Sequence, residues 1–261
     1  MIGNALLLAL RELRRNVMRS FLTMLGIIIG VAAVIILVTL GGGATKQVTD
    51  QISSLGSNLL MVSPGQRMGP GQQAGASPFK LEDAETIKRD ISEANAVAPV
   101  SESSVTAILG NENWTTSVTG TTAEYLTVSN NRISEGRIFN EVEVRTGASV
   151  CVIGETVRTN LFGSQNPVGT KIRLNKISCE VIGLLKSKGQ SSMGRDQDDV
   201  VLLPLLAFQR RISGNENVNR IQVSVKDGYS TDQVIEKIGL LMRGRRHLSE
   251  SEEDDFNVFD M

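Results

Sequence analysis

The sequence predicts an α+β protein in which one membrane-spanning helix precedes a folded exterior domain. Three observations lead to this fold class. Residues 21–40 contain no charged side chain, and arginines cluster just before them. Beyond them, helix-like and strand-like segments follow one another at both ends of a strand-rich centre. This order predicts an α+β lobe with a mostly-β lobe inserted into it.

Residues 1–19 predict an amphipathic helix at the cytoplasmic membrane surface, because apolar side chains recur there at helical spacing. Four arginines lie in or beside this segment, namely Arg11, Arg14, Arg15 and Arg19, and the first cation after the apolar run is Lys46. The positive-inside rule then places the N-terminus in the cytoplasm and the rest of the chain outside. The arginines are candidate contacts with anionic lipid head groups or a cytoplasmic partner.

Residues 20–41 predict the transmembrane helix. At 1.5 Å per residue, the uncharged run of residues 21–40 spans about 30 Å, the thickness of a bilayer's hydrocarbon core. Its polar side chains, Thr23 and Thr39, can bond to their own helix backbone. A buried soluble helix rarely runs this long without a polar face, and the apolar region of a cleaved signal peptide is shorter. We therefore expect a retained membrane span.

Small residues form one face of this helix. Gly26 and Gly30 make a GxxxG pattern, and Ala33 extends it. Such a face lets two helix backbones approach closely, although glycine is common in membrane helices in general. These three residues are candidates for helix–helix packing.

The remaining residues predict four segments of the exterior part. Residues 42–56 continue the helix as a stalk after a glycine break at residues 41–43, and residues 57–105 form the first part of the α+β lobe. A Pro- and Gly-rich segment at residues 64–78 predicts a mobile loop within it. The inserted β-rich lobe covers residues 106–215, and residues 216–261 return to the α+β lobe.

The elements expected within these segments follow from periodicity and turn residues. Helices are predicted at 81–91, 155–161 and 231–242. Strands are predicted at 58–62, 96–100 (stopped at Pro99), 104–109, 115–120, 149–153, 171–174, 179–185, 200–203, 221–225 and 257–259.

Two cysteines, Cys151 and Cys179, each lie on a predicted apolar strand. In an oxidising exterior they can form a disulfide if the two strands are neighbours. The alternative, favoured by their apolar surroundings, is a pair of buried small hydrophobic side chains.

The composition excludes several classes of function. Among 261 residues, 27 Lys and Arg against 28 Asp and Glu give a net charge of −1, so we expect no nucleic-acid partner. The single histidine, His247, excludes histidine-rich metal centres and most catalytic triads. No phosphate-binding loop or nucleophile elbow occurs, and the acidic runs at 196–199 and 250–255 lack a calcium-loop pattern, which favours solvated loops. We therefore expect no catalytic residue, cofactor or metal in this chain.

Several segments, in collinear order, resemble the MacB/FtsX-type ABC transporter permeases. The opening resembles their first membrane helix: ALLLALRELRRNVMRSFLTMLGIIIGVAAVI. Further blocks resemble their periplasmic domain: SLGSNLLMVSPG, VTGTTAEYL, SEGRIF, VCVIGETVRTNLFG, NPVGTKIRL and VIGLLKSKGQSSMGRDQDDVVLLP. The resemblance covers nearly the whole chain.

The resemblance implies a bacterial inner-membrane permease with a periplasmic, porter-like α+β lobe interrupted by a mostly-β lobe. It implies a permease dimer partner and a cytoplasmic ABC ATPase subunit that binds ATP and Mg²⁺. Arg11, Arg14, Arg15 and Arg19 are then candidates for docking that ATPase. ATP hydrolysis would move the periplasmic domains and expel substrate, a mechanism called mechanotransmission. Gram-negative members also use a periplasmic adaptor and an outer-membrane channel.

The sequence departs from the family pattern after Met261, since no second hydrophobic stretch follows the exterior domain, whereas family members have three more membrane helices. We interpret the chain as an N-terminal fragment or one half of a split permease. Two alternatives remain open: a lipoprotein-releasing permease of the same superfamily, and a single-span, membrane-anchored binding or sensor module. An exported enzyme has the least support, because the sequence offers no catalytic set.

Overall fold

A computed structural model describes residues 17–55, 58–65, 76–191, 194–249 and 251–261. The chain divides into two compact units, Met1–Asp50 and Gln51–Met261. The predicted amphipathic helix at residues 1–19 lies outside the described residues except for its last three. The centre of the predicted mobile loop, residues 66–75, also lies outside them, and Pro64 belongs to a strand rather than to that loop.

The first described element is α2, Val17–Leu55, and its segment Val17–Gly42 is long and apolar enough to cross a membrane. None of that segment is buried against the rest of the chain. As expected, Thr39 Oγ1 donates to the Ile35 carbonyl 2.7 Å away, and Thr23 Oγ1 donates to the Arg19 carbonyl. The expected glycine break is wrong, because α2 runs through residues 41–43 without interruption. Glycine costs only about 1 kcal/mol per residue in a helix, which a long helix tolerates.

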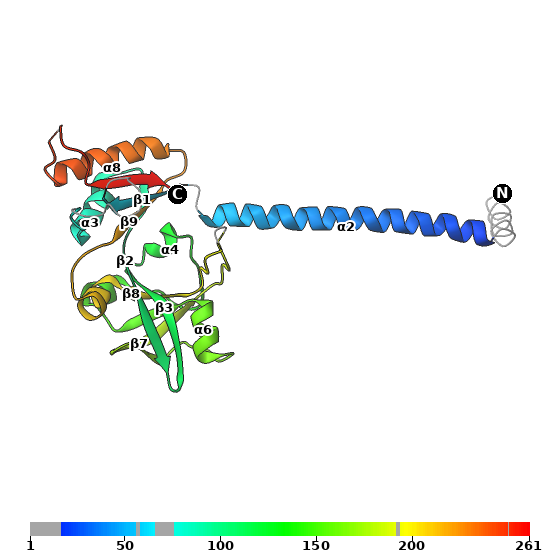
Figure 1. Cartoon of the computed structure of the whole chain (residues 1–261), viewed down its shortest axis with the longest axis horizontal. Coiled ribbons are helices and arrows are strands. Elements are labelled where there is room, and N and C mark those ends of the chain that lie inside the picture. Colours follow the sequence, from blue (N-terminus) through cyan, green and yellow to red (C-terminus); the bar gives the residue numbers. More distant parts are fainter. Residues whose placement is uncertain (1–16, 56–57, 66–75, 192–193, 250) are drawn as a thin grey trace. The chain divides into compact units, whose positions relative to one another are not determined.

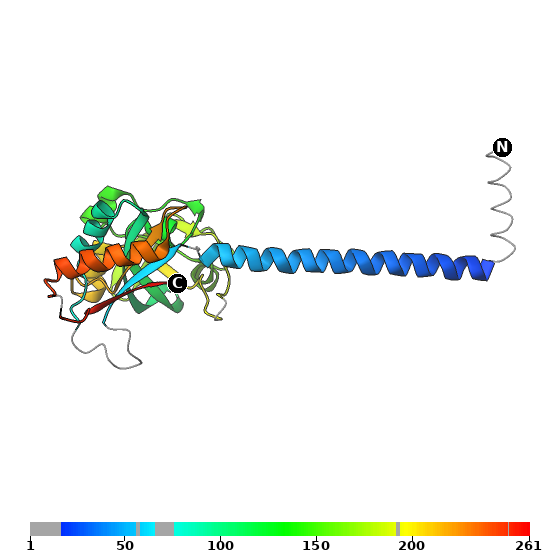
Figure 2. The same ribbon diagram turned by 90° about the horizontal axis from the view of Figure 1, so that it is seen from above.

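The exterior unit is built on a ten-stranded mixed sheet, shown with its helices in Figures 1 and 2. The strand order is β10-β1-β9-β2-β3-β8-β5-β7-β4, and β6 pairs with β2 and β7. The strands are β1 Leu59–Pro64, β2 Ala94–Leu109, β3 Glu112–Thr121, β4 Ile133–Gly136, β5 Val150–Ile153, β6 Lys171–Leu174, β7 Ile177–Leu185, β8 Val200–Pro204, β9 Arg220–Val225 and β10 Phe256–Asp260. The helices are α3 Leu81–Asp90, α4 Tyr125–Val128, α5 Glu141–Thr146, α6 Glu155–Phe162, α7 Leu205–Phe208, the π-helix η1 Gln209–Ser213 and α8 Thr231–Arg245.

The long strand β2 joins the two lobes, and it corrects the prediction of two strands separated at Pro99. Residues 94–100 of β2 pair with β9, and residues 101–109 pair with β3. The Pro99 carbonyl accepts a hydrogen bond from Thr121 Oγ1 at 2.8 Å, on the β3 side. The missing N–H of Pro99 faces that same side, just beyond the last β2–β3 pair, so the ladder loses no hydrogen bond.

Two hydrophobic clusters fill the two lobes. The first lies between β10, β1, β9 and β2 on one side and α3 and α8 on the other, with Ile87, Val223 and Ile238 fully buried. The second packs α6 and α7 against β3, β5, β7 and β8, with Ile153 and Phe208 at its centre. This is the expected α+β lobe with a mostly-β lobe inserted into it. The predicted lobe boundaries at residues 105 and 215 stay predictions.

Five short elements are absent from the sequence prediction, namely α4, β4, α5, α7 and η1. Each has four to six residues, too few for a helical or strand period to be seen. Helix α5 did leave a local signal, since Asn140 and Glu143 form a capping box at its start.

Candidate functional site

The small-residue face of α2 is open. A Cβ atom added to Gly26 or Gly30 would meet no heavy atom within 4 Å, and Ala33 is exposed. Within the described part of the chain, nothing packs on this face, so its surface can accept another helix or lipid. Arg19 is exposed at the start of the helix, whereas Arg11, Arg14 and Arg15 lie outside the described residues.

On the exterior unit, α4 lies over the sheet face opposite α3 and α8. Val128 of α4 packs against Leu59, Ala96 and Ala98, which come from β1 and β2. Pockets open on both sides of this short helix. Tyr125 and Leu126 of α4 also pack against a cluster in the inserted lobe that contains Phe139 and Val152. The position of α4 therefore depends on both lobes.

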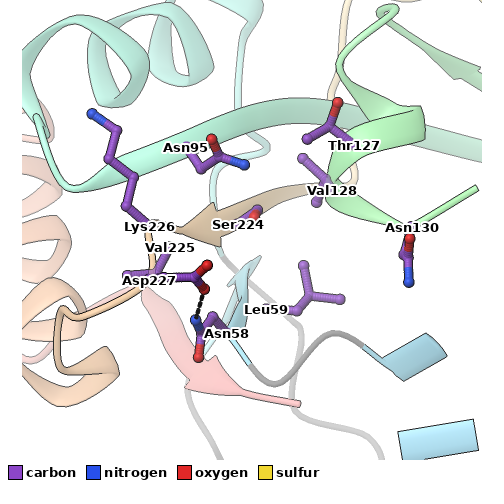
Figure 3. A pocket seen from close by; sticks show the side chains of 10 residues that line it. All are labelled: Asn58, Leu59, Asn95, Thr127, Val128, Asn130, Ser224, Val225, Lys226 and Asp227. Carbon is purple, nitrogen blue, oxygen red and sulfur yellow. Dashed lines mark hydrogen bonds between the residues drawn. The ribbon is translucent and has the colours of Figure 1, made fainter. Parts of the chain in front are cut away.

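The first pocket, of about 280 Å³, is drawn in Figure 3. Amide and hydroxyl side chains line it together with one cationic and one anionic side chain, and Leu59 and Val128 form its apolar wall. The full set is Asn58, Leu59, Asn95, Thr127, Val128, Asn130, Ser224, Val225, Lys226 and Asp227. Two of these residues are joined by a hydrogen bond, which Asn58 Nδ2 donates to Asp227 Oδ1 at 3.4 Å (Figure 3). Asn58 follows the end of α2 by three residues in the sequence.

The second pocket, of about 530 Å³, lies where the two lobes meet. Its walls are Leu59, Glu102, Ser117, Thr119, Tyr125, Ser129, Asn131, Lys188, Arg195, Asp196, Gln197, Asp199, Val200, Gln222 and Met261. Gln222 is only 7% exposed, and its Oε1 atom has no hydrogen-bond partner. A buried acceptor without a donor costs about 1–3 kcal/mol, so a donor from solvent or a ligand would be favourable there.

Charged groups are fixed around this second pocket. Glu102 forms an ion pair with Arg220, and Asp199 Oδ1 accepts a hydrogen bond from Trp114 Nε1 at 2.9 Å. Burial, helped by the negative charge of Glu102, raises the pKa of Tyr125 to about 12. Burial also lowers the pKa of Lys188, against the opposing effect of Asp198. Both shifts show that one side of the pocket is poorly solvated.

Asp198 holds the chain at residues 187–189. The Asp198 carboxylate accepts hydrogen bonds from the Lys188 and Gly189 backbone N–H groups at 2.8 and 2.9 Å, and from Ser187 Oγ. Asp198 is 7% exposed, so the interpretation of residues 196–199 as a solvated acidic run is wrong for this residue. The sequence pattern failed here because the loop folds around the carboxylate and supplies its donors locally.

Cys151 on β5 and Cys179 on β7 lie side by side in the second cluster. The structure contains both as free, buried cysteines, and their sulfur atoms are 2.8 Å apart. Burial raises the pKa of the Cys151 thiol well above its ordinary value, and the hydrogen bond with Cys179 adds to this effect. Within the described ranges, no group of three or more His, Cys, Asp and Glu side chains could hold a metal ion.

Comparison with known proteins gives these features a family. The MacB-like periplasmic core domain family matches residues 20–240, from the apolar helix into α8. The chain belongs to this family. Two of its relatives are macrolide export ATP-binding/permease proteins MacB. The one from Syntrophobacter fumaroxidans is 37% identical, over 87% of this chain and 32% of its own length. The one from Bdellovibrio bacteriovorus is 38% identical, over 96% of this chain and 39% of its own length. The chain thus spans about a third of the length of these relatives.

Solved structures share the family fold. The periplasmic region of MacB from Actinobacillus actinomycetemcomitans has a TM-score of 0.68 at 22% identity, covering 80% of this chain and 91% of that one. The extracellular domain of the noncanonic ABC-type transporter YknZ from Gram-positive bacteria has a TM-score of 0.63, covering 78% of this chain. The resemblance to MacB/FtsX-type permeases is therefore confirmed, as is the fold class. The chain is a membrane protein with a MacB-type periplasmic domain.

Sequence reasoning missed the two pockets. Tyr125, Lys188 and Gln222 come from three distant segments, and no motif joins them. One signal was present, however: the blocks SLGSNLLMVSPG, VTGTTAEYL and VIGLLKSKGQSSMGRDQDDVVLLP each supply walls of the second pocket. Three of the seven segments that carry the family resemblance thus meet at one place in the fold.

Proposed function

We propose that this chain is the membrane anchor and periplasmic part of an ABC-type export permease of the MacB kind. ATP hydrolysis by a cytoplasmic ATPase would move the periplasmic domain and expel substrate, by mechanotransmission. The observation that carries this proposal is the single family match that runs from the apolar helix into the two-lobed exterior sheet. The names of the relatives make macrolides the first substrates to test.

The proposed placement is the bacterial inner membrane, with the N-terminus in the cytoplasm. Arg11, Arg14, Arg15 and Arg19 would then meet anionic head groups or the ATPase subunit, which would bind ATP and Mg²⁺. No catalytic step is assigned to this chain. A periplasmic adaptor and an outer-membrane channel would complete the export path in a Gram-negative cell.

The open face of α2 supports a permease dimer partner. Because no other described part of the chain lies within 4 Å of a Cβ added at Gly26 or Gly30, a second membrane helix can approach the backbone there. Leucine at both positions would hold the helices apart.

The decisive experiment measures ATP-driven export by the assembly that contains this chain, its permease partner and the ATPase. With Gly26→Leu and Gly30→Leu together, we expect export to fall at least roughly tenfold while membrane insertion is kept, because close helix packing is lost. Ile27→Leu with Val31→Leu is the matched control, since it keeps the spacing and hydrophobicity on another face. Full export by the glycine double variant would contradict the packing role, and absence of ATP-driven export by the unaltered assembly would contradict the proposed function.

The second pocket favours one further candidate, a ligand-binding or sensor module. Its volume and the unpartnered Gln222 Oε1 are features of a small-molecule site. The single Trp114 bonds to a wall residue, Asp199, and can report occupancy by fluorescence. Saturable macrolide binding without ATP, lost in Gln222→Leu, would support this candidate. Macrolide export that survives this substitution would favour mechanotransmission without a binding step in this pocket.

A further inference from the structure

The chain has two cysteines, and the fold brings them together from separate segments. Cys151 is 0% exposed and Cys179 is 2% exposed. They lie on β5 and β7, neighbouring parallel strands in which Cys151 pairs with Val181, two residues beyond Cys179. Since side chains alternate along a strand, positions 179 and 181 share one face of β7, and both cysteines face the same core.

The two sulfur atoms lie closer together than side chains in ordinary core packing. Non-bonded heavy atoms usually pack about 3.5–4 Å apart, whereas these sulfur atoms are 2.8 Å apart. A shared metal ion is an alternative for adjacent thiols, but in the part of the chain that the structure describes no further His, Cys, Asp or Glu completes a ligand set. The contact between the two cysteines is therefore interpreted without a metal ion.

We propose that Cys151 and Cys179 are joined by a disulfide that links β5 to β7 in the exported domain. This proposal rests on the exterior placement given under the proposed function, because disulfides form and persist in oxidising compartments outside the cytoplasm. Its effect is a covalent link within the inserted β-rich lobe, between two strands of the sheet that carries α6.

The reaction is a thiol–disulfide exchange with an oxidant that itself carries a disulfide, such as an exported oxidoreductase. One cysteine thiolate attacks the oxidant's disulfide, giving a mixed disulfide and releasing the oxidant's first thiolate. The second cysteine thiolate attacks the mixed disulfide, forming the Cys151–Cys179 bond and releasing the second thiolate. The two protons lost by the cysteines end on the oxidant's thiols, and its disulfide takes up the two electrons.

Burial determines when this reaction takes place. Because burial raises the pKa of Cys151, the folded dithiol contains little of the reactive thiolate. Exchange therefore occurs while the lobe is still folding, before β5 and β7 close over the sulfur atoms. Once formed, the bond is shielded from reductants by the same core, so its reduction requires the lobe to open.

The link closes the segment between residues 151 and 179, which contains α6 and β6. A disulfide stabilises chiefly by restricting the unfolded chain, in the entropic account. Reduction of the unfolded protein followed by refolding without oxidant is therefore expected to lower the melting temperature of the domain by roughly 5–15 °C. The variant with Cys151→Val and Cys179→Ala should melt at the same temperature with and without reductant.

The test uses the full chain in its own membrane. Cells are quenched in acid, the protein is denatured, and free thiols are alkylated with a polyethylene-glycol maleimide before and after reduction. We expect no modified thiol before reduction and two afterwards, with a cross-linked peptide containing Cys151 and Cys179 in mass spectrometry. Two modified thiols before reduction, in a chain whose exterior domain is cut by protease added to spheroplasts, would overturn the proposal.

A second arm separates this proposal from the proposed function. If protease in spheroplasts does not reach the domain, the exterior placement fails. The purified full chain is then unfolded, reduced and refolded with oxidised glutathione. Formation of the intramolecular Cys151–Cys179 link supports the pairing, while mixed disulfides with glutathione on both cysteines overturn it. Cys151→Ser and Cys179→Ser each leave one thiol and control for pairing between chains.

Discussion

Helix α2 and the exterior unit differ in the exposure of their apolar side chains. In α2, large apolar side chains such as Ile27, Leu37 and Leu40 are more than 60% exposed. In the exterior unit, residues of the same kinds, such as Leu60, Ile153 and Ile221, are fully buried. The exterior unit therefore contains its own apolar environment, whereas α2 requires one from lipid or from other helices. The exterior unit is therefore stabilised by its own core, whereas α2 is stabilised by the lipid or the helices around it.

Glycine shows the same contrast. In α2, a Cβ on Gly26 or Gly30 would meet only open space. In the exterior unit, a Cβ on Gly154 would overlap the backbone carbonyl of Asp198, and one on Gly120 would overlap the Phe208 ring. The glycines of α2 keep a surface open for a partner, while those of the exterior unit allow contacts that are already made.

The largest effect expected from this comparison is on the exterior core. Phe208→Ala should lower the free energy of unfolding of the exterior unit by about 3–5 kcal/mol, because Phe208 is 1% exposed and its removal leaves a cavity in the second cluster. Ile28→Ala in α2 is the control and should change that quantity by less than about 0.5 kcal/mol, since Ile28 belongs to the other unit and is exposed. Denaturant unfolding followed by Trp114 fluorescence measures both. Equal losses in the two variants would show that α2 and the exterior unit unfold together.

Glycine-to-alanine changes are expected to have smaller effects on stability, with opposite signs in the two regions. Gly154→Ala should destabilise the exterior unit by about 1–3 kcal/mol, because the new methyl group meets the Asp198 backbone, which cannot rotate away. Gly26→Ala should instead stabilise the isolated helix by about 1 kcal/mol. The readouts are the unfolding free energy of the exterior unit and the thermal loss of helical circular dichroism in detergent. A neutral Gly154→Ala would mean that the loop at Asp198 yields more easily than its hydrogen bonds imply.

The extent to which sequence predicts structure also differs between the two regions. The membrane segment is predicted from one property, hydrophobicity over many consecutive residues, and the same property marks Val17–Gly42 of α2 as long and apolar enough to cross a membrane. The bounds 20–41 stay a prediction. Strands with clear alternation were also predictable, and β6 has the predicted bounds, Lys171–Leu174. The division of β2 at Pro99 failed, because whether a proline breaks a strand depends on which side its missing N–H faces. That depends on the neighbouring strands.

The candidate sites were predictable only where they are local. The Gly26–Gly30 spacing is contained in one helix, so the sequence reveals it directly. The second pocket needs α4 to lie over β1 and β2, and α4 itself depends on Val128 packing against strands far away in the sequence. The cysteine pair is intermediate: each strand was predicted, and their adjacency was stated only as a condition, because strand order is set by the whole sheet.

The smallest expected effect is a loss of stability at alkaline pH from Tyr125, which lines the second pocket. At neutral pH this loss is absent. Burial raises the pKa of Tyr125 to about 12 in the folded state, against about 10 in an unfolded chain. Between these values the unfolded chain loses the proton first, so the stability is complete below about pH 10 and falls as the pH rises toward 12. Tyr125→Phe removes this titration and should flatten that part of the stability–pH curve. An unchanged alkaline loss in Tyr125→Phe would place its origin elsewhere, and a Tyr125 titration near pH 10 would show that the pocket wall under α4 is open to water.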